Sequence, residues 1–151
     1  MAAQRTATLA TVADDGRPRL VPICFVVDAS APEARGIVVW SPLDAKPKRV
    51  EDVHDLARVR DIRARPEVVL LFDRWSEDWA ELAWVRVDGQ ATVVDPGDDP
   101  GSHAKAVAAL RAKYPQYRAQ PIDRLPMVRI ALTGTTHWEA TPGRGGRTAP
   151  A

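Results

Sequence analysis

Alternating and continuous apolar segments along the chain predict six strands and two helices. Residues 6–13 are rich in Thr, Val and Ala and end at Asp-Asp-Gly, a sequence typical of a turn. Residues 82–95 alternate apolar and polar side chains, as a half-buried strand does, and Gly89 marks a bend or bulge. The other predicted strands are the almost entirely apolar residues 36–41 and 67–73, expected to be buried, and residues 19–28 and 126–140.

Apolar residues recur at near-helical spacing in two further segments, residues 47–64 and 98–114. Pro66 ends the first helix, because the residue before a proline is disfavoured in helical geometry. Pro22 inside residues 19–28 predicts an edge strand or a bulge, because proline donates no hydrogen bond to a neighbouring strand.

Antiparallel strands with inserted helices predict a mainly-β α+β protein built as a small barrel, rather than a doubly wound parallel sheet. We expect one domain over residues 1–140. Residues 141–151 contain too little apolar surface to pack and are predicted to form a flexible tail.

Composition excludes several classes of partner. The 151 residues include 21 Lys and Arg against 20 Asp and Glu, so the broad basic surface of a nucleic-acid-binding protein is not expected. The single cysteine, Cys24, cannot form an internal disulfide, which fits a reducing cytoplasm. The apolar segments are far shorter than the roughly 20 residues that span a membrane, and the N-terminus lacks a signal-peptide pattern. We therefore expect a cytoplasmic protein with no membrane partner.

A cluster of cations precedes the first predicted helix. Lys46, Lys48 and Arg49 lie where a helix begins, and free backbone N–H groups and the positive end of the helix dipole also favour an anion there. Such a junction suits a phosphate group, and Arg60 could contribute if the ligand is extended. The alternative is a solvated charged turn that binds nothing.

Five tryptophans in a chain of this length are many. Trp40 ends a buried strand beside the basic segment, while Trp75 and Trp79 lie in a polar connection where core packing does not need them. Aromatic side chains of this kind suit a flat heteroaromatic cofactor or the surface of a partner subunit. Trp84 and Trp138 are predicted to be core residues.

The sequence offers no nucleophile with its base. His54 and His103 fall in polar helical segments and are predicted to lie on the surface, and neither they nor His137 have partners at metal-ligand spacing. Phosphate-loop, dinucleotide and nucleophile-elbow motifs are missing from the sequence. Cys24 reads as an inert core thiol. An enzyme built on this chain would therefore need a cofactor to carry the reaction.

Several segments resemble the pyridoxamine-phosphate-oxidase-like split-barrel superfamily. The segment ATLATVADDGRPRLVPICFVVD resembles its opening hairpin, and DAKPKRV with RVRDIRARPEVVLLFD resembles its phosphate turn, helix and next strand. The segment RWSEDWAELAWVRVDGQATVVD, followed by LRAKYPQY, is similar to the branch that uses coenzyme F420, a deazaflavin.

This resemblance implies a six-stranded antiparallel split β-barrel that works as a homodimer, with two equivalent sites along the subunit interface. It assigns the cofactor phosphate to Lys46, Lys48 and Arg49. It places the cofactor ring along the strand of Pro22 and Cys24, beside the strand end of Trp40 and Ser41. It brings Trp75 and Trp79 toward the site, from the same chain or from the partner.

The resemblance also implies an activity, hydride transfer from reduced F420 to a small organic acceptor that the sequence does not identify. An FMN-binding oxidase or reductase of the same fold stays open, as does a non-catalytic module that binds haem or another flat tetrapyrrole. Relatives have a helix before the first strand, so an upstream extension or the helix at residues 98–114 is expected to cover that end of the barrel. Asp61 stands where relatives often have Asn.

Overall fold

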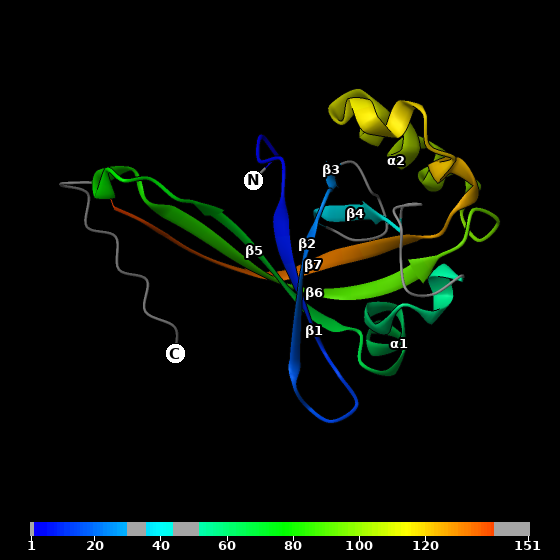
Figure 1. The fold of residues 1–151 in the computed structure, drawn as a ribbon, viewed down its shortest axis with the longest axis horizontal. Coiled ribbons are helices and arrows are strands. Elements are labelled where there is room, and N and C mark those ends of the chain that lie inside the picture. Colours follow the sequence, from blue (N-terminus) through cyan, green and yellow to red (C-terminus); the bar gives the residue numbers. More distant parts are fainter. Residues whose placement is uncertain (1, 30–35, 44–51, 141–151) are drawn as a thin grey trace.

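One seven-stranded antiparallel sheet organises the part of the chain that the computed structural model describes, residues 2–29, 36–43 and 52–140 (Figure 1). The strand order is β2-β1-β5-β6-β7-β4-β3. The strands are β1 (Ala7–Val12), β2 (Pro18–Ile23), β3 (Val26–Asp28), β4 (Val38–Pro42), β5 (Glu67–Arg74), β6 (Ala83–Val94) and β7 (Met127–Glu139). The helices are α1 (Ala57–Ala64) and α2 (Pro100–Lys113), with short 3-10 turns at Val53–Asp55, Trp79–Glu81, Pro115–Arg118 and Ile122–Arg124.

The two edge strands of this sheet are consecutive in the sequence. Six strand-to-strand steps of about 4.8 Å would put β2 and β3 roughly 29 Å apart in a flat sheet. Only Cys24 and Phe25 join the two strands, and three Cα steps span at most about 11 Å. The sheet therefore rolls until its edges meet, which confirms the predicted mainly-β barrel architecture. The figure shows β1 and β2 crossing the line of β6 and β7 for this reason (Figure 1).

Each helix packs against a different part of the sheet. Val59 and Ile62 of α1 enter the main core, with apolar side chains from β1, β4, β5, β6 and β7. Val107 and Leu110 of α2 belong to a second cluster with residues of β3, β4 and β7. All five residues of β4 are buried, as predicted, because α2 and the main core lie on its two faces.

The predicted strand at residues 19–28 is broken, which is why the sheet has seven strands and not six. Cys24 and Phe25 leave the ladder, and β3 then pairs with β4 on the opposite edge. Pro22 does lie in an edge strand, as predicted.

Two other expectations need correction. Residues 44–51 lie outside the described residues, and within the rest of the segment predicted as helix 47–64, α1 begins only at Ala57, because Leu56 has extended backbone (φ −61°, ψ 136°). The strand predicted as buried, residues 67–73, alternates instead: Val68, Leu70 and Phe72 are buried while Leu71 is exposed. No helix covers the outer face of β5, so only its inner side chains enter the core.

A bulge interrupts the β6–β7 ladder at the predicted position. Asp88 pairs with Gly134 and Gly89 with Leu132, which leaves Thr133 without a partner strand residue. A Cβ atom on Gly89 would lie 2.6 Å from the Ile130 side chain, so the ladder can pass this point only with glycine.

His103 is buried, contrary to the prediction that it lies on the surface. Its Nε2 atom donates to the carbonyl of Leu125 at 3.0 Å. This bond ties the first turns of α2 to the segment that leads into β7. None of the helices in the described ranges is long and apolar enough to cross a membrane.

The C-terminal end of α2 supplies the hydrogen bonds that the strand break needs. Phe25 is fully buried, and its N–H donates to the Tyr114 hydroxyl at 3.0 Å. The Phe25 carbonyl accepts from the Lys113 ammonium at 3.0 Å and lies 2.9 Å from the Tyr114 hydroxyl, which also lies 2.9 Å from the Arg5 carbonyl. Burial raises the pKa of Tyr114, and burial together with Arg5 lowers the pKa of Lys113. This end of α2 thus holds both the strand break and the residues before β1.

Replacing Tyr114 with Phe tests the hydrogen bonds between the end of α2 and the strand break. The change leaves the buried Phe25 N–H without an acceptor, which costs about 1–3 kcal/mol. At roughly 2–4 °C per kcal/mol for a chain of this size, the Tm in differential scanning calorimetry should fall by several degrees. Thr92→Val, which removes a hydroxyl at an exposed position of β6, should leave the Tm unchanged. Equal Tm values for wild type and Tyr114→Phe would contradict the assigned role.

The N-cap of α2 predicts a pH-dependent contribution to stability. The Asp99 carboxylate accepts from the Ser102 N–H at 3.0 Å, and this bond lowers the pKa of Asp99 in the folded state. A carboxyl group with a lowered folded pKa stabilises the fold above its unfolded pKa of about 3.9 and loses that effect as pH falls. Asp99→Ala should therefore have a lower Tm than wild type at pH 7, and the difference should shrink below about pH 4. Asp14→Ala, in the exposed β1–β2 turn, is the matched control, and a pH-independent difference for Asp99→Ala would contradict the cap.

Candidate cofactor site

The predicted phosphate-binding cations lie in a segment anchored at both ends. Lys46, Lys48 and Arg49 belong to residues 44–51, outside the described residues. Before the segment, the Leu43 N–H donates to the Pro126 carbonyl at 3.2 Å. After it, the Asp52 carboxylate accepts from the backbone N–H of His54 at 2.8 Å. The basic segment therefore runs from the buried end of β4 to the turn that precedes α1.

His54 secures the second anchor. Its Nε2 atom lies 3.2 Å from the Asp95 carboxylate, and its Nδ1 atom lies 2.7 Å from the Arg63 guanidinium. His54 was predicted to lie on the surface, and it is half-buried there and held by these two contacts. It connects the start of α1 to the end of β6, and sequence spacing alone gave no signal of that contact.

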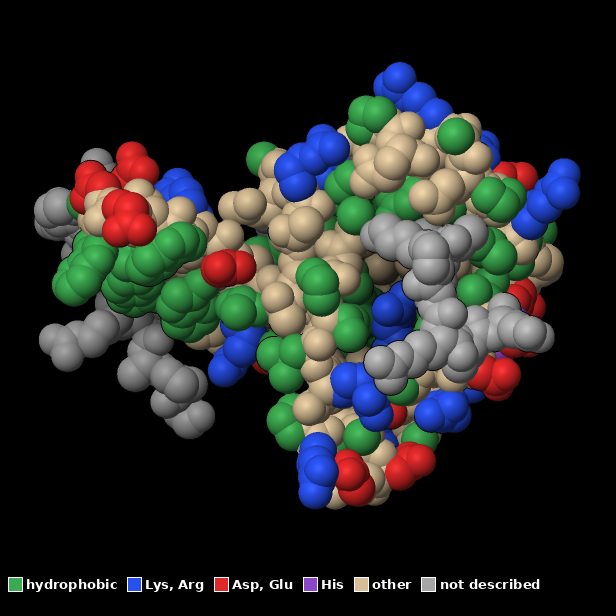
Figure 2. Space-filling model, viewed as in Figure 1, with side chains coloured by type: hydrophobic (Ala, Val, Ile, Leu, Met, Phe, Trp, Pro, Cys, Tyr) green, Lys and Arg blue, Asp and Glu red, His purple; other side chains and the backbone are tan. Residues whose placement is uncertain are grey.

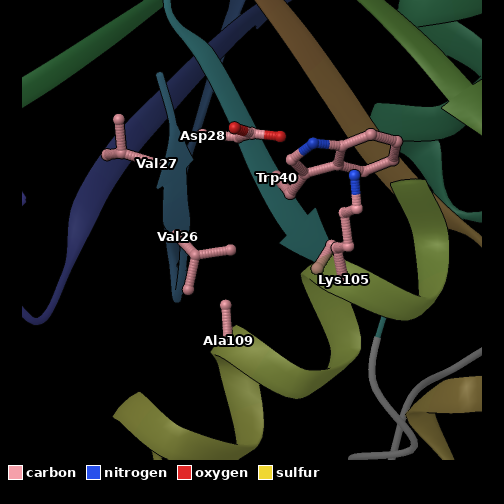
Figure 3. Close-up of a pocket in the computed structure, with 7 residues that line it drawn as sticks. Val26, Val27, Asp28, Trp40, Lys105 and Ala109 are labelled. Carbon is pink, nitrogen blue, oxygen red and sulfur yellow. The ribbon is translucent and has the colours of Figure 1, made fainter. Parts of the chain in front are cut away.

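Trp40 and Ser41 are buried at the end of β4. Trp40 pairs with Val26 of β3 on one side and with Arg129 of β7 on the other. Its indole lines a cavity of about 200 Å³ between β3, β4 and α2. Figure 3 shows the side chains of Asp28 of β3 and Lys105 of α2 reaching toward the indole. The sequence analysis missed Lys105 because α2 begins 60 residues after Trp40.

Cys24 lies in the same region. It is partly exposed and packs against the cluster that contains Trp40. The structure therefore places Cys24 against the apolar cluster of β3, β4 and α2 that includes Trp40. Pro22 belongs to a different surface.

Pro22 lies on the outer face of the sheet. Cross-strand pairing puts it in one row with Thr8, Leu71, Arg86 and Thr136, across five strands. The neighbouring row toward the far end of β5 holds Asp73, Trp84 and Trp138. Pro22 thus shares its face with the tryptophan-bearing end of the sheet.

That end of the sheet forms an arm. The far ends of β5, β6 and β7, with the β5–β6 connection, extend away from the helices (Figure 1). The side chains of Trp75, Trp79 and Trp138 are 70%, 75% and 46% exposed. Figure 2 shows hydrophobic side chains gathered along one side of the arm and acidic ones at its tip.

The prediction that Trp84 and Trp138 are core residues was wrong for Trp138, and Trp84 is only half-buried. The strands continue past the body, where neither of the described helices covers them (Figure 1). The alternating pattern predicted the strand, but it could not predict which part of the strand other elements would bury.

Arg60 and Asp61 have opposite environments on α1. Arg60 is exposed, and its Nη1 atom donates to the Asp55 carbonyl at 2.9 Å. Asp61 is buried and accepts from the Thr11 hydroxyl at 2.7 Å and from the Arg19 guanidinium at 2.8 Å. The carboxylate that replaces the relatives' Asn is therefore engaged inside the fold, where it joins α1 to β1 and β2.

The predicted residues do not converge within one chain. Trp40 and Cys24 lie at β3 and β4, Arg60 on α1, and the arm tryptophans at the other end of the outer face with Pro22 between. Among the described residues no group of three His, Cys, Asp or Glu side chains could hold a metal ion. A site that used all of these groups would need an arm from a second chain.

Comparison with known proteins decides the family. The sequence profile described as pyridoxamine 5'-phosphate oxidase matches residues 1–139, nearly the whole described chain. The chain belongs to this family.

Solved structures share the fold at low sequence identity. A conserved hypothetical protein from Mycobacterium tuberculosis has a TM-score of 0.66 and 21% identity, over 97% of this chain and 88% of its own. HutZ, the heme storage protein from Vibrio cholerae, has a TM-score of 0.62 and 16% identity, over 91% and 87%. A structure named F420 reductase has a TM-score of 0.59 and 18% identity, over 87% and 88%. The search of curated proteins gave no match. These likenesses establish the architecture of the pyridoxamine 5'-phosphate oxidase family for this chain.

Proposed function

We propose that this protein is an F420-dependent reductase that passes a hydride to a small organic acceptor. The observation that carries the proposal is the run of Lys46, Lys48 and Arg49 directly after the buried strand β4, in a chain that the family profile covers from residue 1 to 139. Similarity to the structure named F420 reductase and the RWSEDWAELAWVR and KYPQY segments support this choice of cofactor.

The donor chemistry of the chain fits such a group. Two ammonium groups and a guanidinium in four residues can form charge-assisted hydrogen bonds to a phosphodiester. Bound reduced deazaflavin would supply the hydride. The sequence contains none of the nucleophile motifs considered above, so we assign binding, orientation and exclusion of water to the chain's own residues.

Each predicted residue then has a limited task. Lys46, Lys48 and Arg49 hold the phosphate, and exposed Arg60 reaches a more distant anionic part of the cofactor. Pro22 offers a flat apolar surface on the edge strand, close to the strand break at Cys24. The arm residues Trp75 and Trp79 exclude water from the ring when they come from a partner subunit.

A homodimer follows from the same reasoning. The arm tryptophans expose a large apolar surface to solvent, and exposed apolar patches of this kind mark interaction sites. A dimer brings the arm of one chain to the outer face of the other, so that two equivalent composite sites form.

The second candidate function is cofactor binding without turnover. The fold likeness to HutZ favours haem as the ligand in that case, and FMN would fit the same basic segment. The colour of the purified protein separates the three: flavin bands for FMN, a Soret band for haem, and quenching of added F420 fluorescence for the proposed reductase.

The double variant Lys48→Ala/Arg49→Ala tests the phosphate assignment. Loss of one or two charge-assisted hydrogen bonds at about 1.5–3 kcal/mol each should weaken F420 binding roughly ten- to a hundredfold, measured by fluorescence titration. The loss should shrink at high salt, where screening already weakens wild-type binding. Arg17→Ala/Arg124→Ala removes the same charge at exposed positions elsewhere and should bind F420 like wild type. Unchanged affinity in the Lys48 and Arg49 variant would make the segment a solvated turn.

The oligomeric state is checked by multi-angle light scattering. We expect twice the chain mass of 16.5 kDa at micromolar concentration, with an interface above about 1,000 Å². A stable monomer at that concentration would remove the composite site, while the phosphate assignment would still be tested by the titration above.

A further inference from the structure

A cavity of about 420 Å³ opens on the outer face of the sheet, at the end opposite the arm. Its walls are largely apolar, from Ala10 and Val12 of β1, Pro18 of β2 and Val69 of β5. Two carboxylates, Glu67 and Asp88, are among its lining residues. None of the residues assigned to the cofactor lines it.

The β6–β7 bulge shapes this cavity. Thr133, the residue without a pairing partner, is part of the lining. A Cβ atom on Gly134 would lie 3.2 Å from the Asp88 carboxylate, so glycine leaves that side of the carboxylate uncovered. Asp88 is about half exposed, with the Arg86 guanidinium 3.9 Å away, and Glu67 accepts from Gln90 at 3.3 Å. The cavity therefore combines apolar walls with hydrogen-bond acceptors.

This combination suits an indole ring, which is a large flat apolar group with a single N–H donor. Two of the arm's tryptophans, Trp75 and Trp79, belong to the polar connection between β5 and β6 and are mostly exposed, more than Trp138 of β7. Along β5 of one chain, the cavity lies at the rows of Glu67 and Val69, and the rows of Leu71 and Asp73 follow. Trp75 and Trp79 come after Asp73, so within one chain the cavity and the arm tryptophans lie at opposite ends of the strand.

Twofold symmetry can bring these two ends together. In a dimer built on the outer face, an axis in the interface plane that runs across the strands exchanges the two ends of the face. The arm of one chain then lies over the cavity of the other, and the relation is reciprocal. An axis along the strands would instead leave each arm projecting past both bodies, with its tryptophans still exposed.

We infer that the cavity receives an arm tryptophan from a second copy of this chain, the partner's Trp75 or the partner's Trp79. The inference rests on the homodimer of the proposed function and adds a specific contact to it.

Filling the cavity tests this contact. Ala10→Trp places a large side chain within it and should raise the dimer dissociation constant at least tenfold in sedimentation equilibrium. Ala112→Trp, the same change on the exposed surface of α2, should leave the constant unchanged. Trp75→Ala and Trp79→Ala identify the inserted ring, since one of them should weaken the dimer by a similar factor.

Combining the changes gives the decisive comparison. Ala10→Trp with the sensitive tryptophan variant should be no weaker than the worse single variant, because both remove one contact. Multiplicative losses, or a dimer unaffected by Ala10→Trp, would overturn the inference. Loss of dimer strength in Ala112→Trp as well would also overturn it.

A cross-link provides an independent readout. A covalent heterodimer should form under oxidising conditions when Ala10→Cys chains are mixed with Trp79→Cys chains or with Trp75→Cys chains. As the control, Ala112→Cys chains mixed with the same tryptophan variants should form no covalent heterodimer. Failure of both pairs while F420 binding still depends on Lys48 and Arg49 would remove the arm contact and leave the proposed function standing. Loss of cofactor dependence with an intact cross-link would do the reverse.

Discussion

The buried backbone of Phe25 sets the condition for closing this sheet. The chain passes from one sheet edge to the other through two residues that belong to no ladder, and the peptide groups of Phe25 are cut off from water there. Buried N–H and C=O groups need partners, and no strand can supply them at the break. Tyr114 and Lys113 of α2 do so. A helical element near the end of the chain thus closes a sheet that begins near its start.

The same helix fixes the end of β4, from which the basic segment proposed to hold a phosphate begins. Its apolar side chains Val107 and Leu110 pack with Val38 and Trp40 of β4, and His103 holds the segment before β7, the strand that pairs with β4. The end of β4 is therefore fixed by β3, β7 and α2 together. The basic residues that follow start from a rigid position, which favours tight binding because less freedom is lost when a ligand is bound. The KYPQY segment, conspicuous in the sequence, serves this architecture through its lysine and first tyrosine.

Much of the fold could be predicted from residue patterns because most strands and α2 follow simple periodicities. The strand at residues 6–13 and the helix at residues 98–114 agree with β1 and α2 within two residues at each end. The break at Cys24 could not be predicted, because a continuous apolar segment has the same pattern whether it forms one strand or passes from one edge of the sheet to the other. The exposure of Trp138 and the burial of His103 depend on which elements cover them, and only tertiary structure decides that.

For the candidate site as well, sequence predicts the chemical groups better than it predicts their positions. Chemistry pointed to Lys46, Lys48 and Arg49, which lie outside the described residues, so their assignment stays a prediction. Trp40 and Cys24 share a region as expected, whereas Pro22 and the arm tryptophans share a different face. Sequence could name the groups but not their distribution over two surfaces, because that distribution depends on how the sheet rolls.

The long-range pairing of this sheet also has a consequence for how the chain folds. β1 pairs with β5, and Pro42 of β4 pairs with Met127 of β7, so the local strand pairs are the β1–β2, β3–β4 and β5–β6 hairpins and the other pairings are long-range. Loop-closure entropy opposes such contacts, and chains dominated by them fold slowly. The outer edges of β2 and β3 have no partner strand among the described residues, and α2 packs against β3. An edge that is not yet covered invites association between chains. Newly made protein is therefore most vulnerable to aggregation in the interval before its last helix docks.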